Sequence, residues 1–219
     1  MKNLNKDIAV LGLGTFGYEL AKDLFQAKLH VLAVDINPQL INKIKNDVTV
    51  AVQADVTDME VLKKLDLNQF DKVILGMSNS LENLILTITY LKKINTKYII
   101  AKANTEIQKE ILLKIGANEV IQPEISIAKM LVKKIAYPFM IETLAVDSEN
   151  VVVEVKVPNK FTNRSIRELN FRQKYGILIL MKKSDSKYQI VTNPDERLSE
   201  NDIIFVAGKE TQIQKVFES

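Results

Sequence analysis

The sequence predicts an α/β protein, with a Rossmann-type, doubly wound sheet of six parallel strands followed by a small α+β domain. Short apolar runs alternate with amphipathic helical patterns up to about residue 122, as in repeated βα units. A glycine-rich turn at 12–17 directly follows the first run. After Pro138 the pattern becomes strand-rich. The 219 residues exceed one Rossmann unit and fall short of two, so we expect domains at 1–137 and 138–219.

The glycine-rich turn has the form G-x-G-x-x-G between a strand and a helix. The apolar run 8–11 fits a buried parallel strand and leads straight into it. Gly12 allows the tight turn, Gly14 lets a pyrophosphate approach the backbone, and Gly17 lets the next helix pack closely. The N–H groups and the positive dipole end of that helix favour an anion. The alternative is a domain that keeps these glycines for packing and binds no nucleotide.

Asp35 closes the second apolar run, 31–34, where the fingerprint places a carboxylate for ribose hydroxyls. No arginine follows it, only Ile36 and Asn37. A 2′-phosphate would therefore meet uncompensated negative charge, which disfavours NADP.

The remaining βα units follow in order. A helix after Gly17 ends near Lys28, and Asn37-Pro38 supplies an N-cap and a first-turn proline for the next. Thr57 and Glu60 are expected to form a capping box. Further helices are expected around 84–91 and at 105–115, and further strands at 48–53, 73–77, 98–102 and 119–121.

The carboxyl ends of parallel strands meet at one edge of the sheet, where ligands bind in such folds. For Ser78 and Asn79 a loop or cap role is the alternative. The predicted nucleotide-binding residues are Gly12, Gly14, Thr15, Phe16, Gly17, Asp35, Ile36, Asn37, Asp55, Val56, Ser78, Asn79 and Lys102.

The segment 123–137 predicts a helix with apolar side chains on more than one stripe, including Ile127, Met130, Leu131 and Ile135. A helix packed only on its own sheet needs one stripe. The surplus indicates a second contact, most simply a copy of the same helix across a dimer axis. The alternative is that the following segment, 139–141, covers it.

The C-terminal domain is expected to contain strands and two short helices. Ser165 and Glu168 form a capping box for one helix, and 211–217 is the closing helix. Strands are expected at 151–157, 176–181, 188–191 and 203–208.

The composition excludes several classes of protein. Lys and Arg total 30 and Asp and Glu 27, and the net charge of +3 is too small and too evenly spread to indicate a nucleic-acid partner. The chain has no cysteine, which excludes disulfides and thiolate nucleophiles and suits a reducing compartment. It has neither a signal-peptide core nor an apolar run near the roughly 18 residues of a membrane span. We therefore expect any membrane role to come through a partner.

A dehydrogenase needs a proton-transfer group beside the nicotinamide. The single histidine, His30, starts the second strand, opposite the ligand edge. Lys102 could serve, but the second domain looks too small to enclose a substrate. The pattern favours a sensor, with a small NAD(H)-dependent oxidoreductase as the alternative.

Motifs along nearly the whole chain resemble the cytosolic regulatory subunits of the Ktr/Trk potassium uptake systems, which consist of an RCK (KTN) N-terminal domain and an RCK C-terminal (TrkA-C) domain. The motifs are VLGLGTFG, VLAVDIN, QADVTD, IGANEVIQPE, the cap at 165–169, LNFRQKYG at 169–176 and NDIIFVAG at 201–208.

The resemblance implies a homodimer that assembles into an octameric ring beneath a membrane-embedded potassium-translocating subunit, on the cytoplasmic side. Nucleotides in the N-terminal domain gate the transporter, with ATP and ADP favouring opposite states in the Ktr type and NAD(H) acting in other members. Many ATP-responsive members have arginine where this chain has Thr15. ATP, ADP and NAD(H) therefore all stay open.

The resemblance also implies two further sites. Glu124 matches the glutamate of the family's QPE or HPE motif and would bind Mg²⁺ or Ca²⁺ beside the phosphates, in its own site or in the partner's; the alternative is an acid that favours the helix dipole. In some members cyclic di-AMP binds at the C-terminal dimer interface, here expected at Ile166, Arg172, Ile177 and Pro194. Leu178 replaces an asparagine of some binding members. The alternative is that the isoleucines are core and Arg172 is a surface charge.

Overall fold

A computed structural model describes residues 6–77, 80–184, 187–200 and 202–218. The chain forms two compact units, Met1–Ser126 and Ile127–Ser219, which we describe separately. The break between them falls within the sequence of helix α6 (Pro123–Ala136). The domain boundary predicted after residue 137 stays a prediction.

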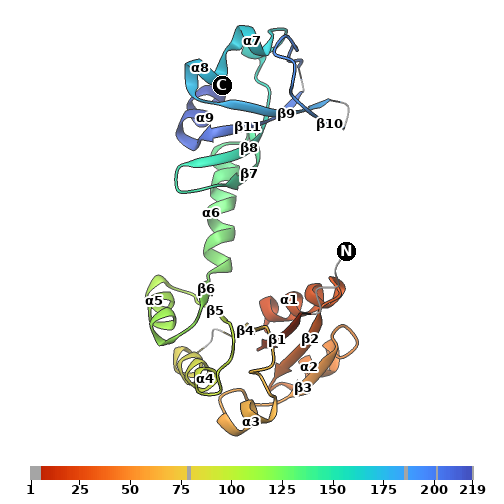
Figure 1. Ribbon diagram of the computed structural model, residues 1–219, viewed down its shortest axis with the longest axis vertical. Helices are drawn as coiled ribbons and strands as arrows, with labels where there is room; N and C mark the ends of the chain where they lie inside the picture. Colours follow the sequence, from red (N-terminus) through yellow and green to blue (C-terminus); the bar gives the residue numbers. More distant parts are fainter. Residues whose placement is uncertain (1–5, 78–79, 185–186, 201, 219) are drawn as a thin grey trace. The chain divides into compact units, whose positions relative to one another are not determined.

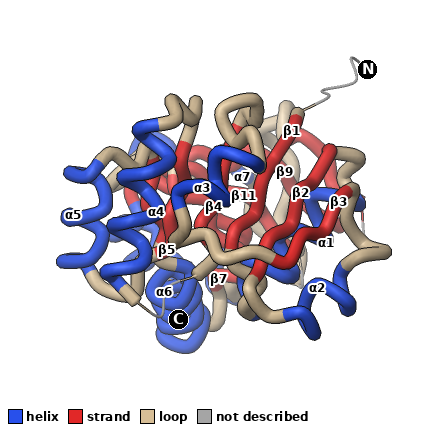
Figure 2. The backbone as a smooth tube through the Cα atoms, turned by 90° about the horizontal axis from the view of Figure 1, so that it is seen from below, coloured by secondary structure: helices blue, strands red, loops and turns tan. Residues whose placement is uncertain are grey.

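The first unit contains a six-stranded parallel sheet in the order β3-β2-β1-β4-β5-β6, which confirms the predicted doubly wound fold (Figure 1). β3 lies at one edge of the sheet, and α4 and α5 lie toward the other end (Figure 2). The strands are β1 (Asp7–Leu11), β2 (His30–Asp35), β3 (Val50–Gln53), β4 (Lys72–Leu75), β5 (Ile99–Lys102) and β6 (Glu119–Ile121). The helices are α1 (Thr15–Gln26), α2 (Pro38–Ile44), α3 (Met59–Lys64), α4 (Leu81–Lys93) and α5 (Glu106–Ile115).

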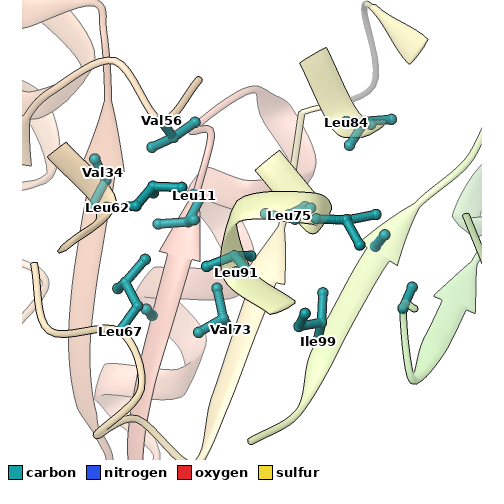
Figure 3. Packing of buried hydrophobic residues seen from close by; sticks show 14 of the residues in the cluster. Leu11, Val34, Val56, Leu62, Leu67, Val73, Leu75, Leu84, Leu91 and Ile99 are labelled. Atoms are coloured by element: carbon teal, nitrogen blue, oxygen red, sulfur yellow. The ribbon is translucent and has the colours of Figure 1, made fainter. Parts of the chain in front are cut away.

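The central strands β1, β2, β4 and β5 are buried on both faces, which is why they are continuous apolar runs. On one face, side chains of β1 and β4 such as Leu11 and Leu75 pack with Leu62 of α3 and Leu91 of α4 (Figure 3). On the other face, Val10 belongs to a separate cluster with side chains of α1 and α2. These two layers fix the strand ends that form the site.

The helix caps agree with the sequence at α2 and differ at α3. Asn37 accepts a hydrogen bond from the Gln39 N–H, and Pro38 follows it, as predicted. The predicted capping box of Thr57 and Glu60 is wrong, because α3 begins one residue later and Asp58 is its N-cap. Thr57 instead donates to the Asp55 carboxylate from its N–H and its hydroxyl. An aspartate two residues upstream therefore holds Thr57 in the turn before the helix.

The second unit contains a five-stranded antiparallel sheet in the order β10-β9-β11-β8-β7. One face packs on helices through a core that includes Val153, Phe171 and Phe217. The capping box of Ser165 and Glu168 is confirmed. The strands are β7 (Met140–Ala145), β8 (Asn150–Lys156), β9 (Leu178–Ser184), β10 (Lys187–Ile190) and β11 (Ile203–Lys209), and the helices are η1 (Asn159–Phe161), α7 (Ile166–Leu169), α8 (Phe171–Tyr175) and α9 (Glu210–Phe217).

Two elements of this sheet differ from the prediction. β7 was not predicted: it is an edge strand, and an irregularity between Met140 and Glu142 interrupts the alternation that identifies strands. β9 starts at Leu178 rather than at Gly176. Gly176 is the C-cap of α8 with φ of 67°, a left-handed conformation that glycine adopts readily.

Candidate functional site

A cavity of about 790 Å³ opens at the carboxyl ends of the strands in the first unit. Ten of the residues predicted to bind a nucleotide line it, and Glu124 does as well. Gly17 does not line it, and Ser78 and Asn79 lie outside the described residues. Among the described residues, the lining consists of Gly12, Gly14, Thr15, Phe16, Asp35, Ile36, Asn37, Leu40, Ala54, Asp55, Val56, Thr57, Gly76, Met77, Ser80, Asn83, Lys102 and Glu124.

The glycines of the turn have different roles. Gly12 has φ of 93°, and a Cβ there would lie 2.8 Å from the Met77 nitrogen. A Cβ on Gly17 would collide with the Gly12 carbonyl oxygen, and one on Gly76 would lie 2.5 Å from the same oxygen. A Cβ on Gly14 would meet no protein atom within 4 Å. Gly12, Gly17 and Gly76 therefore serve packing, whereas Gly14 presents a bare backbone to the cavity.

Among helices α1 to α5 of the first unit, α1 is the one whose N-terminus has no side-chain cap. Gly14 is its N-cap, no side chain accepts from its first-turn N–H groups, and its first turn holds no acidic residue. By contrast, Asn37, Asp58, Ser80 and Thr105 cap the other four helices. Uncapped N–H groups beside open space suit an anion such as a phosphate.

Asp35 ties the end of β2 to the glycine-rich turn. Its Oδ2 accepts from the Leu13 N–H at 2.6 Å, and its Oδ1 accepts from the Asn37 N–H at 2.8 Å. These bonds fix the carboxylate at the cavity wall. Each carboxylate oxygen can accept a second hydrogen bond, so the position is compatible with a ribose hydroxyl donor.

The segment after β3 forms the neighbouring wall. Asp55 is held by Thr57, whose N–H and hydroxyl lie 2.9 Å and 2.7 Å from its Oδ1. The Val56 carbonyl accepts from the hydroxyl of Thr87, a fully buried residue of α4, at 3.2 Å. The wall is thus anchored to the helix behind it, and Val56 adds apolar surface suited to an adenine ring.

Lys102 and Glu124 close the far side. Lys102 is the last residue of β5 and only 9% exposed, and its Nζ lies 2.5 Å from Glu124 Oε1. The hydrogen bond from Lys102 holds the pKa of the Glu124 carboxyl below its ordinary value. Among the described lining residues, Lys102 is the one cationic side chain.

Several lining residues were not predicted: Leu40, Ala54, Thr57, Gly76, Met77, Ser80 and Asn83. A signal existed for Gly76, since a glycine inside an apolar run often marks close backbone approach. The predicted strand 73–77 ends at Leu75 because Gly76 leaves β4 to pack against the glycine-rich turn.

The cavity fits an adenosine nucleotide. Its phosphates suit the uncapped helix end, the exposed backbone at Gly14 and Lys102, and its ribose suits the Asp35 carboxylate. The cavity fits a divalent cation less completely. Within the described part of the chain no three His, Cys, Asp or Glu side chains group as a metal site, and Glu124 pairs with Lys102. A cation here would need phosphate oxygens, waters or a second chain for most of its ligands, so the metal role of Glu124 stays a prediction.

Comparison with known proteins gives a match for each unit. Residues 8–123 match the TrkA-N domain, and residues 151–219 match the TrkA-C domain. The chain belongs to the TrkA-N and TrkA-C domain family. This TrkA-N/TrkA-C protein is 31% identical over 212 residues to the Ktr system potassium uptake protein C of Bacillus subtilis (strain 168), over 97% of this chain and 96% of that protein. The resemblance to Ktr/Trk subunits is therefore confirmed.

Solved structures show the same fold. The GsuK RCK domain matches with a TM-score of 0.64 at 17% identity, over 100% of this chain and 48% of that one. The GsuK channel bound to NAD matches with a TM-score of 0.63 at 17% identity, over 97% of this chain and 39% of that one. This chain thus spans about half or less of those chains.

The TrkA-C unit has a second cavity, of about 380 Å³. Ile166, Arg172, Ile177 and Pro194, the four residues expected at a cyclic di-AMP site, all line it. Ile177 is 1% exposed and belongs to the core, whereas Arg172 and Pro194 are exposed. The structure brings the four residues together, and the identity of a ligand stays a prediction.

Other features bear on function. His30 lies at the amino end of β2, with its Nδ1 3.2 Å from Asp7 Oδ1, and it does not line the first cavity, which agrees with its predicted place opposite the ligand edge. No helix among the described residues is long and apolar enough to cross a membrane.

Proposed function

We propose that this protein is a non-catalytic, nucleotide-sensing regulatory subunit that gates a membrane-embedded potassium-translocating partner. It would act at the cytoplasmic face of the membrane, which it reaches through that partner. The observation that carries the proposal is the cavity between the uncapped start of α1, Gly14, Asp35 and Lys102, in a chain homologous to a Ktr potassium uptake protein.

The ligand we propose is ATP, ADP or NAD(H). Asp35 suits an unmodified ribose, and the α1 N-terminus suits a phosphate. The GsuK channel, which shares the fold, has been solved with NAD. A small NAD(H)-dependent oxidoreductase is the second candidate, favoured only by Lys102 in the cavity; its pairing with Glu124 argues against a proton-transfer role.

We propose that the protein acts as a homodimer within an octameric ring. Five apolar residues of α6 are more than half exposed: Ile127, Met130, Leu131, Val132 and Ile135. A contiguous apolar surface of this kind is rare on monomers. A second copy of the same helix is the simplest cover, because a two-fold axis buries the same patch on both chains.

Two finer proposals concern regulation. Cyclic di-AMP is proposed for the cavity of the TrkA-C unit, where Arg172 could hold a phosphate through two hydrogen bonds and Ile166 and Pro194 could contact adenines. Glu124 is proposed to reach Mg²⁺ or Ca²⁺ beside nucleotide phosphates. The first depends on the dimer, whereas Glu124 could act in its own site or in the partner's.

The experiment is potassium flux through the membrane partner in vesicles, with and without the purified protein, under ATP, ADP, NAD or NADH. The proposal predicts a flux that depends on the protein and changes with the nucleotide. Turnover of NADH with no effect on flux would favour the oxidoreductase.

A further inference from the structure

We propose that the Lys102–Glu124 ion pair is a displaceable latch that sets the selectivity of the nucleotide site for phosphorylated ligands. Phosphate oxygens take Lys102 from Glu124, and Glu124 lowers their affinity by competing for the same ammonium group. This inference rests on the proposed nucleotide site and concerns how that site distinguishes its ligands.

Lys102 is fixed in place by its surroundings. Its backbone lies in β5 between β4 and β6, and its side chain is only 11% exposed. A buried ammonium requires an anionic or hydrogen-bonding partner, and Glu124 Oε1 at 2.5 Å supplies one. A phosphate oxygen in the cavity is an equivalent partner, since both are anionic oxygens.

Glu124 is the exposed member of the pair. Its side chain is 64% exposed and lies in the first turn of α6, so the carboxylate can turn into water at little solvation cost. Its carboxylate already contacts Lys102 Nζ, so it competes with a phosphate oxygen for the same ammonium group. The asymmetry between a buried cation and an exposed anion means that an incoming phosphate displaces Glu124 rather than Lys102.

The other charges of the cavity make phosphate binding depend on this exchange of partners at Lys102. Asp35 and Asp55 add negative charge to the wall, and both are held by hydrogen bonds from backbone or Thr57. Thr15 brings no charge to the glycine-rich turn. Lys102 is therefore the cation in the described lining that can neutralise a phosphate, and Glu124 controls its availability.

Displacement also changes the start of α6. A carboxylate in the first turn of a helix interacts favourably with the helix dipole and so stabilises the helix. Pairing with Lys102 offsets part of the negative charge of Glu124 and weakens this interaction. Phosphate binding would free that charge at the start of a helix whose residues from Ile127 belong to the second unit. Through the latch, phosphates on the ligand would change the charge at the start of α6, the helix that connects the two units in sequence.

The test is calorimetric titration of the full chain with adenosine, AMP, ADP and ATP in EDTA, which excludes divalent cations. Glu124→Gln should bind ADP at least about fivefold more tightly, and Lys102→Met about 10- to 100-fold more weakly, as expected for a charge-assisted hydrogen bond. Neither should change the affinity for adenosine. In the double variant, Glu124→Gln should have no further effect, because its target is gone.

Two controls separate the latch from general effects. Glu106→Gln removes the same charge from the first turn of α5, where Glu106 pairs with Lys109 at 3.6 Å outside the cavity, and should leave ADP affinity unchanged. Lys102→Arg keeps the positive charge and should retain ADP binding. That result would show that Lys102→Met loses affinity because the charge is missing, not because the protein misfolds.

The outcomes are distinct. If the wild type binds none of the nucleotides, the proposed nucleotide site and the latch both fail. If the wild type binds ADP but Glu124→Gln binds it equally or more weakly in EDTA, the latch is wrong and the nucleotide site stands. An equal gain from Glu124→Gln with and without Lys102 would show a general charge effect and would also overturn the latch.

Discussion

Gly14 and Gly17 provide the sharpest test of the nucleotide site, because the structure predicts opposite consequences for the two substitutions. A side chain at Gly14 meets no protein atom within 4 Å, and its backbone, with φ of −58° and ψ of 178°, is open to any residue. Gly14→Val should therefore fold normally. Its Cβ branches would occupy the cavity where phosphates approach the α1 N–H groups.

The magnitude follows from the bonds that would be lost. A hydrogen bond to a charged group contributes about 1.5–3 kcal/mol, so excluding a phosphate from one or two N–H groups should weaken ADP binding by roughly 10- to 1,000-fold or more. Stability should change by less than about 1 kcal/mol, the scale of glycine replacement at a compatible site. Gly17→Ala should instead destabilise the fold, because its Cβ would collide with the Gly12 carbonyl oxygen of a rigid turn.

The assay is calorimetric titration with ADP together with urea unfolding of the wild type and both variants. Normal ADP binding by Gly14→Val would show that the glycines serve packing alone. An unfolding midpoint for Gly14→Val as low as that of Gly17→Ala would refute the distinction drawn between the two positions.

Four further predictions follow from the same structure. Asp35→Ala should weaken ADP binding by about 1.5–3 kcal/mol through loss of the ribose acceptor; an unchanged dissociation constant by calorimetry would contradict that role. Ile135→Asp, at a residue 70% exposed, should shift the protein toward monomer in size-exclusion chromatography without lowering its unfolding midpoint; an unchanged oligomer would remove α6 from the interface. Arg172→Ala should weaken cyclic di-AMP binding about tenfold or more in titrations of the full chain; absence of binding by a dimeric wild type at high micromolar ligand would remove that site. Lys102 lowers the pKa of Glu124, so the ion pair contributes its full stability above the unfolded pKa of about 4.3 and loses it as the pH falls through the lower folded pKa. NMR titration should therefore find a higher Glu124 pKa in Lys102→Met than in the wild type. An equal Glu124 pKa in both proteins would contradict the pairing.

The sequence predicts the first unit well because its strands are buried on both faces and its turns use residues with narrow conformational roles. Apolar runs such as 8–11 leave little choice but buried strands, and Gly12 marks a turn that requires positive φ. Prediction fails where a long-range contact decides. Gly76 extends an apolar run and reads as strand, yet β4 ends at Leu75, and a Cβ on Gly76 would lie 2.5 Å from the Gly12 carbonyl oxygen. The glycine itself indicates a close backbone approach, but no local pattern reveals which segment approaches it.

The ion pair at Lys102 shows the same limit within the site. Lys102 and Glu124 could each be assigned to the ligand edge from the sequence, because Lys102 ends one predicted strand and Glu124 follows the next. Their pairing could not, because it depends on the register of β5 against β6 and on the angle at which α6 begins. Glu124, predicted as a metal ligand, forms an ion pair with Lys102 in this structure, and its metal role stays a prediction.

The unpredicted strand β7 ends next to an exposed apolar residue, and the surplus apolar stripe of α6 is exposed as well. Leu144 is 68% exposed and Val132 is 63% exposed, so neither is buried by its own unit. Helices and strands are recognised in a sequence by the spacing of the apolar residues that they bury. If an apolar face is buried against another chain, the contacts within one chain do not account for that spacing. The interface that the surplus on α6 indicates stays a prediction, and the lack of clear alternation along 140–145 hid an edge strand. If a second copy covers these residues, hydrogen exchange at 127–146 should slow as the protein dimerises, and exchange independent of concentration would contradict this explanation.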